Sequence, residues 1–151
     1  GHFGMSTAEI SEALTNLELP ERRLKLRKFE GFSIIDDSYN INPDSANSAL
    51  SYLSTFKGRK IIITGGIVEQ GKYSAQRNIE LGETIAKIVD VAVIAKNNFS
   101  GFIKKGIDQT RSGIKVIESP DPKETPRILR SILRTGDIIL IQNELPDLYW
   151  H

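Results

Sequence analysis

Residues 34–45 have the sequence Ile34-Ile-Asp-Asp-Ser-Tyr-Asn-Ile-Asn-Pro-Asp-Ser45, which changes abruptly from apolar to polar. Phe32, Ile34 and Ile35 predict a buried strand. Pro43 then precedes apolar residues at helical spacing, and proline is well tolerated in the first turn of a helix. The stretch therefore predicts a strand, a polar loop and the start of a helix. Because ligands bind at the carboxyl ends of strands in open parallel sheets, and helix N-termini suit anions, we expect a ligand site here.

The rest of the chain alternates short apolar runs with helical patterns. We expect six strands, at residues 23–29, from 32, and at 60–64, 91–95, 114–117 and 137–141, and helices at 6–17, 45–55, 74–88, 99–109 and 122–134. Continuous apolar runs between helices are typical of a sheet covered on both faces, so the pattern predicts parallel βαβ units in a three-layer α/β sandwich. The turn at Glu30-Gly31 is too short for a crossover, so the first strand should be antiparallel. Ser6 and Glu9 have the spacing of a capping box for the first helix.

The composition limits the classes of function. The chain has 151 residues, of which 39% are hydrophobic and 26% charged, as expected of one globular domain. Its net charge of +1 gives no bulk attraction to nucleic acid or to an anionic membrane, and no apolar run approaches the ~20 residues that span a bilayer. The absence of cysteine excludes disulfides and thiolate metal sites and is compatible with the cytoplasm, where we expect the protein. The two histidines, His2 and His151, lie at the termini, so we expect no metal site and no catalytic residue.

Residues 66–73 resemble a phosphate loop of the form G-x-x-x-x-G-K-[ST] without completing it. Gly66, Gly71 and Lys72 match the motif, but Tyr73 occupies the position of the hydroxyl that holds magnesium. Glu69 also introduces a carboxylate where backbone amides would surround a phosphate. A glycine-rich turn between a strand and a helix is therefore the favoured interpretation, and it places this loop at the same edge of the sheet.

Several stretches resemble the Mur ligases, and in particular the type that adds D-alanyl-D-alanine. Residues 36–45 are similar to the signature D-D-S-Y-N-A-N-P-x-S of that type. The segment Pro20-Glu-Arg-Arg-Leu24 resembles the P-x-G-R-L that precedes the signature, with Arg22 where glycine is usual. Residues 63–71 resemble the strand and loop T-P-G-x-x-E-L-G, and the ending Glu144-Leu-Pro-Asp-Leu-Tyr149 is similar to the tails of some members.

The resemblance implies the Rossmann-like C-terminal domain of a three-domain ATP-dependent ligase. That family activates a carboxylate as an acyl phosphate, and an incoming amine then forms an amide. The resemblance implies that residues 20–151 are this domain and that residues 1–19 combine a terminal scar with the tail of a missing central domain. The implied partners are the missing central and N-terminal domains, a UDP-muramoyl-peptide and a D-amino acid or dipeptide, with ATP as cofactor and Mg²⁺ held mainly by the central domain.

The resemblance also assigns site residues to both sides of the expected cleft. The nucleotide side comprises Arg23, Asp37, Tyr39, Asn40 and Asn42, with Arg23 at the phosphates and Asp37 at or near the ribose. The side facing the incoming substrate comprises Gly66, Glu69, Asn143 and Glu144. The cleft has only one wall here and no intact phosphate loop, so the resemblance predicts an isolated chain without ligase or ATPase activity.

Two other functions are compatible with these residues. One is a free-standing binding or regulatory α/β domain, which a coding sequence without an upstream phosphate loop would favour. The other is a nucleotide-binding domain that uses Gly66–Lys72 as its own phosphate loop, in which case replacing Lys72 with Ala would cause a large loss of nucleotide affinity. A folate polyglutamate ligase is a variant of the ligase interpretation, and it is disfavoured because its motif would have histidine where Asn40 stands.

Overall fold

The computed structural model describes residues 6–10, 25–37, 43–67, 71–110 and 113–142. These residues form a six-stranded sheet with the order β1-β2-β6-β3-β4-β5. The strands are β1 (Lys25–Phe29), β2 (Phe32–Asp37), β3 (Lys60–Thr64), β4 (Val91–Ala95), β5 (Lys115–Ser119) and β6 (Asp137–Gln142). Apart from a short helical stretch at residues 7–10, the α-helices of the described residues are α2 (Pro43–Ser54), α3 (Ser74–Ile88), α4 (Ser100–Thr110) and α5 (Thr125–Ile132). Short 3-10 turns, Gly71–Tyr73 and Pro122–Glu124, precede α3 and α5.

The predicted fold class is confirmed. β1 is antiparallel to β2, and the pairings of β2 with β6, β6 with β3, β3 with β4 and β4 with β5 are all parallel. The strands and the helices expected after residue 24 are present with shifts of a few residues at their ends, and the helix expected at residues 122–134 divides into a 3-10 turn and α5. Since β6 lies between β2 and β3, the last strand of the described residues occupies the middle of the sheet.

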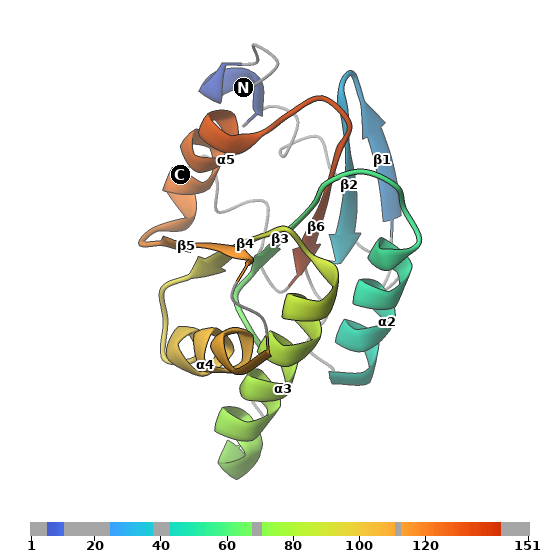
Figure 1. Ribbon diagram of the computed structural model, residues 1–151. Helices are drawn as coiled ribbons and strands as arrows, with labels where there is room; N and C mark the ends of the chain where they lie inside the picture. Colours follow the sequence, from blue (N-terminus) through green and yellow to red (C-terminus); the bar gives the residue numbers. More distant parts are fainter. Residues whose placement is uncertain (1–5, 11–24, 38–42, 68–70, 111–112, 143–151) are drawn as a thin grey trace.

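An apolar cluster lies on each face of the sheet, and α2, α3 and α4 cover one of these faces (Figure 1). Side chains of α2, α3 and α4, among them Leu50, Leu81 and Ile103, pack on one face against Ile62 and Leu140. The opposite face packs against α5 and against Ile10. Alternating residues of each inner strand therefore point to opposite layers, as a three-layer sandwich requires.

Helices α3 and α4 cross at two glycines. A Cβ atom on Gly82 would lie 2.1 Å from the backbone oxygen of Ile103, and one on Gly106 would lie 2.0 Å from the backbone oxygen of Ile79. Real Cβ atoms do not approach backbone atoms so closely, so the absence of a side chain at both positions allows the two helix backbones to touch. The pair of helices therefore packs as one unit on the face of the sheet that carries Ile62 and Leu140.

Residues 7–10 are helical and begin with the predicted capping box. The Glu9 backbone N–H donates to Ser6 Oγ at 3.1 Å, and the Ser6 backbone N–H donates to Glu9 Oε1 at 3.3 Å. Ile10 is only 2% exposed and belongs to the same apolar cluster as Leu129 of α5. The rest of the helix expected at residues 6–17 lies outside the described residues, and the assignment of residues 1–19 to a neighbouring domain stays a prediction.

Candidate functional site

Three polar residues end three adjacent parallel strands in one row. Asp37 ends β2 and is in register with Gln142, which ends β6, and Gln142 is in register with Thr64, which ends β3. Two positions earlier, a row of apolar residues has the same register and packs against α2 and α3. Since side chains two residues apart on a strand share a face, the polar row lies on the side of the sheet that these helices cover.

The polar row is buried. Asp37 is 7% exposed, while Thr64 and Gln142 have no exposed surface. The side-chain amide of Gln142 donates to the backbone oxygen of Ala46, in the first turn of α2, at 3.3 Å. Its Oε1 atom is buried and has no hydrogen-bond partner among the described residues. The carboxyl edge therefore carries a carboxylate and an amide oxygen that can accept hydrogen bonds.

Asp36 and Asp37 lie on opposite faces of the sheet, because neighbouring side chains of a strand alternate between its faces. Asp36 is in register with Ile141 of β6, whose side chain belongs to the apolar cluster on the α5 side. It is 1% exposed. The two carboxylates therefore do not form a paired acid and base, and of the two Asp37 belongs to the row at the candidate site.

The segment that follows β3 is held by side chains from three parts of the fold. Thr64 Oγ1 accepts a hydrogen bond from the backbone N–H of Gly66 at 3.0 Å. Asn78 of α3 accepts from the backbone N–H of Ile67 at 2.8 Å and donates to the backbone oxygen of Ile67 at 2.9 Å. Asn97, just before α4, donates to the backbone oxygen of Gly65 at 2.9 Å. The backbone of residues 65–67 is thus fixed between β3, α3 and α4.

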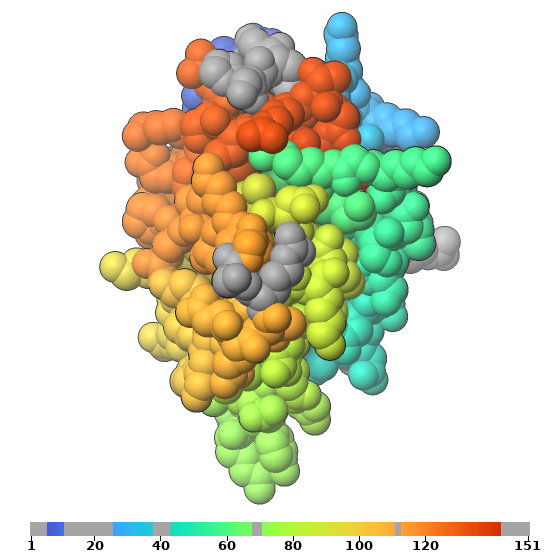
Figure 2. Space-filling view, in the orientation of Figure 1, coloured from blue at the N-terminus to red at the C-terminus, as the bar shows by residue number. Residues whose placement is uncertain are grey.

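Gly66 is required by this arrangement. Its φ angle is +86°, in the region that favours glycine, and a Cβ atom there would lie 2.9 Å from Asn78 Oδ1 and 3.2 Å from Ile103 Cδ1. The first turns of α3 follow and project beyond the rest of the molecule at its lower end (Figure 2). There Lys72 Nζ lies 5.2 Å from the ring centroid of the exposed Tyr73.

Of the predicted site residues the structure describes Asp37, expected on the nucleotide side, and Gly66, expected on the substrate side, and both lie at the carboxyl edge of the sheet. The other predicted site residues, namely Arg23, Tyr39, Asn40, Asn42, Glu69, Asn143 and Glu144, lie outside the described residues.

Sequence reasoning did not single out Thr64, Asn78 or Gln142. Asn78 carries a signal that could have been used, because it shares the buried face of α3 with Leu81 and Ile85. A polar residue at an apolar position of a helix needs hydrogen-bond partners, and a strand-end loop is the nearest source of them. Thr64 and Gln142 carry the weaker signal of a polar residue directly after a run of isoleucines or leucines.

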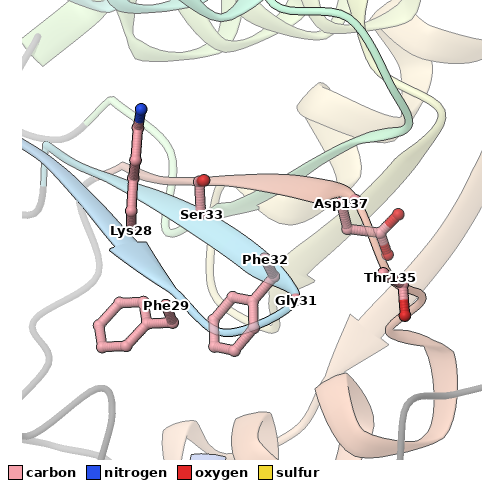
Figure 3. A pocket seen from close by; sticks show the side chains of 8 residues that line it. Lys28, Phe29, Gly31, Phe32, Ser33, Thr135 and Asp137 are labelled. Atoms are coloured by element: carbon pink, nitrogen blue, oxygen red, sulfur yellow. The ribbon is translucent and has the colours of Figure 1, made fainter.

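A hollow lies at the opposite edge of the sheet, where β2 and β6 begin (Figure 3). Its volume is about 300 Å³, and it is lined by Lys28, Phe29, Gly31, Phe32, Ser33, Thr135, Gly136 and Asp137. The rings of Phe29 and Phe32 stack with their centroids 5.1 Å apart. The hollow lies at the amino ends of the strands, away from the polar row.

The Asp137 carboxylate in this hollow already accepts hydrogen bonds from other parts of the fold. Asp137 is 2% exposed and accepts hydrogen bonds from Arg59 Nε at 3.1 Å and from Arg59 Nη2 at 2.7 Å. The backbone N–H of Arg134 donates to the same carboxylate at 2.7 Å. This bidentate pair joins the start of β6 to the segment before β3 and leaves the carboxylate little capacity for a ligand.

An ion pair joins α4 to the edge strand β5. Lys104 Nζ lies 2.8 Å from Glu118 Oε2. The hydrogen bond from Lys104 lowers the pKa of the Glu118 carboxyl below its ordinary value, against the opposing effect of its partial desolvation. Both side chains are partly exposed, so this pair is a feature of the surface.

Across the described ranges, no cluster of three or more His, Cys, Asp or Glu side chains could hold a metal ion. Nor does any helix in those ranges have the length and apolar character needed to cross a membrane.

The matching family model and the related sequences indicate the same kind of protein. The family model described as "Mur ligase, glutamate ligase domain" matches residues 22–142. The chain is 25% identical to the UDP-N-acetylmuramoyl-tripeptide–D-alanyl-D-alanine ligase of Bacillus subtilis over 93% of its own length and 32% of that protein. It is 25% identical to the ligase of the same name from Mycobacterium leprae over 92% of its length and 31% of that protein.

Solved structures agree in fold. The MurF ligase of Thermotoga maritima, solved in complex with ADP, matches with a TM-score of 0.71 at 23% identity, over 89% of this chain and 30% of that one. The chain thus spans about a third of the length of these relatives. With the family model covering most of the chain, from β1 to β6, the protein belongs to the Mur ligase family, in which it corresponds to the C-terminal domain.

Proposed function

We propose that the chain is the substrate-binding and cleft-closing domain of an ATP-dependent ligase of peptidoglycan precursor synthesis. The ligase adds D-alanyl-D-alanine, or a similar amine, to a UDP-muramoyl-peptide, with central and N-terminal domains of the same enzyme as partners. The names of the curated relatives support this substrate pair. Use of ATP places the reaction in the cytoplasm, and the net charge of +1 favours neither nucleic acid nor a membrane as a partner.

The polar row at the carboxyl edge is the observation that carries the proposal. Asp37 offers carboxylate oxygens at the end of β2 and is 7% exposed, and it lies beside the fully buried Gln142 at the end of β6. Acceptors of this kind fit the hydroxyl donors of a ribose, whereas phosphate oxygens need N–H donors or cations. The described residues therefore fit the nucleoside end of ATP. Arg23 supplies the cation for the phosphates, and Tyr39, Asn40 and Asn42 complete the nucleotide side of the cleft.

The triphosphate and its Mg²⁺ are held mainly by the central domain in this proposal. When bound, ATP supplies the phosphoryl group that activates the substrate carboxylate. This chain binds and orients the incoming amine through the segments that contain Gly66, Glu69, Asn143 and Glu144. No catalytic residue is assigned to it, so the isolated chain should neither ligate nor hydrolyse ATP.

The alternative in which Gly66–Lys72 is an independent phosphate loop is disfavoured by hydrogen bonding. A phosphate loop needs free backbone N–H groups, but those of Gly66 and Ile67 already donate to Thr64 and Asn78. Replacing Lys72 with Ala should therefore change nucleotide affinity less than about twofold, whereas a loss of tenfold or more, equivalent to about 1.4 kcal/mol, would favour that alternative.

The experiment compares this chain with the full-length protein that carries it. Each is incubated with ATP, Mg²⁺, UDP-muramoyl-tripeptide and D-alanyl-D-alanine, while phosphate release is recorded and the product is weighed by mass spectrometry. Only the full-length protein should form product, and phosphate release should require both peptide substrates. Product formation or ATP hydrolysis by the isolated chain at the full-length rate would contradict the proposal, as would a full-length protein without ligase activity.

A variant tests the role of Asp37 in the full-length protein. Replacing Asp37 with Ala removes a charged acceptor at the ribose, and loss of a hydrogen bond to a charged group is worth about 1.5–3 kcal/mol, so the KM for ATP should rise at least about tenfold. Replacing Asp108 with Ala, on the exposed surface of α4, is the matched control and should leave that KM unchanged. Equal KM values for ATP in the two variants would show that Asp37 does not contribute to nucleotide binding.

A further inference from the structure

Asn78 has a specific relation to the segment that leaves the carboxyl end of β3. Its side chain has no exposed surface and makes three hydrogen bonds to backbone groups. Oδ1 accepts from the N–H of Ile67 at 2.8 Å, while Nδ2 donates to the oxygen of Ile67 at 2.9 Å and to the oxygen of Ser74 at 2.8 Å. One amide group therefore pairs both polar groups of Ile67 and ties them to the first turn of α3.

The chemistry of this position is demanding. The side chain must accept one hydrogen bond and donate two, all inside the protein. Aspartate could accept but could not donate, and an apolar residue of similar size could do neither. Either replacement would leave buried backbone groups of Ile67 without partners, which is costly because water cannot reach them.

The segment and Asn78 also fix each other sterically. Gly66 adopts a positive φ, and a Cβ atom on it would lie 2.9 Å from Asn78 Oδ1. Thr64 and Asn97 bond two further backbone groups of the segment, the N–H of Gly66 and the oxygen of Gly65. Because these groups are bonded within the protein, the N–H groups of Gly66 and Ile67 do not serve as donors to a ligand.

We propose that Asn78 is a positioning residue for the incoming amine. It does not touch the substrate; it holds the backbone of Ile67 so that the chain leaves β3 on one fixed path beside the polar row. The backbone of residues 65–67 is therefore already ordered before the substrate binds. This inference rests on the proposed function, because that function supplies the substrate.

The first experiment measures the local effect in this chain. Asn78→Ala removes all three hydrogen bonds, and Ile85→Ala, the matched control, deletes a buried apolar side chain from the same face of α3. Amide hydrogen exchange is compared at urea concentrations that give both variants the same free energy of unfolding. The Ile67 amide should then exchange at least about tenfold faster in Asn78→Ala, because only there has it lost its acceptor. Equal exchange rates in the two variants would overturn the inference.

The second experiment measures steady-state kinetics of the full-length protein. Asn78→Ala should raise the KM for the D-alanyl-D-alanine type of substrate about tenfold, equivalent to roughly one lost hydrogen bond, and leave the KM for ATP within about twofold. Ile85→Ala should change neither value by more than about twofold. A rise in both KM values, or the same rise in both variants, would overturn the positioning role. A wild-type protein without ligase activity would instead contradict the proposed function, and hydrogen exchange at Ile67 would still decide whether Asn78 fixes the segment.

Discussion

The close packing of α3 against α4 predicts a loss of stability when one methyl group is added where the two helices cross. In Gly106→Ala the new Cβ would lie 2.0 Å from the backbone oxygen of Ile79 and 2.9 Å from the backbone nitrogen of Glu83. Both neighbours are backbone atoms of α3, so the helices must separate by more than 1 Å to restore contacts of about 3.4 Å or longer. Overpacking of this kind costs about 1–3 kcal/mol, and the severity of the contact places it near the upper end.

Helix propensity opposes part of this cost. Alanine is favoured over glycine in a helix interior by about 1 kcal/mol, so the net loss of stability in Gly106→Ala should be about 2 kcal/mol. For a chain of this size that loss should lower Tm by about 4–8 °C. Urea unfolding followed by circular dichroism measures the free energy, and a thermal scan measures Tm.

Gly101→Ala is the matched control, because it makes the same substitution in the same helix. A Cβ on Gly101 would meet no atom within 4 Å, so this variant should be as stable as the wild type or slightly more stable. If Gly106→Ala and Gly101→Ala agreed within about 0.5 kcal/mol, the close contact of the two helix backbones would not exist as described.

Three further substitutions test other features. Arg59→Ala removes both side-chain hydrogen bonds to the buried Asp137 carboxylate, so stability should fall by about 3 kcal/mol in urea unfolding, and a loss below about 1 kcal/mol would show that the pair contributes little. Lys104→Ala should raise the pKa of Glu118 in an NMR titration, since the hydrogen bond from Lys104 is the main cause of its depression. A carboxyl whose pKa is lowered in the folded state stabilises the protein at pH values above its ordinary pKa of 4.5, and this stabilisation is lost as the pH falls. The wild type and Lys104→Ala should therefore converge in stability under acid, and an unchanged Glu118 pKa would contradict this. Gln142→Leu removes a buried oxygen that has no partner in the described ranges, but it also removes the Nε2 donor that bonds the oxygen of Ala46. The two effects oppose each other, so the free energy of unfolding should change by less than about 1 kcal/mol, and a loss of about 3 kcal/mol would contradict this balance.

The layers of the fold were predictable because they depend on local patterns. The run Lys60–Thr64 contains three successive isoleucines, which is typical of a short strand buried on both faces, and helical spacing follows each such run. The two-residue turn at Glu30-Gly31 likewise dictated the antiparallel pair β1 and β2. These features are decided within about ten residues of sequence, so no knowledge of distant contacts was needed.

The order of the strands and the details of the site were not predictable in this way. Nothing near Asp137 indicates that β6 enters the sheet between β2 and β3, because parallel pairing is set by packing across the whole domain. The row that joins Asp37, Gln142 and Thr64 exists only through that insertion. The support of Ile67 by Asn78 depends on how closely α3 packs beside the end of β3.

The central claim is that nucleotide binds at the carboxyl edge of the sheet, and chemical-shift mapping of this chain with ADP tests it most directly. The probe is ADP added to millimolar concentration to the ¹⁵N-labelled protein, because a single wall of a cleft should bind weakly. The account predicts that the amides of Asp37, Thr64 and Gln142, at the carboxyl edge, shift as ADP is added. Shifts confined to Phe32, Thr135 and Gly136, around the hollow at the amino edge, would contradict it.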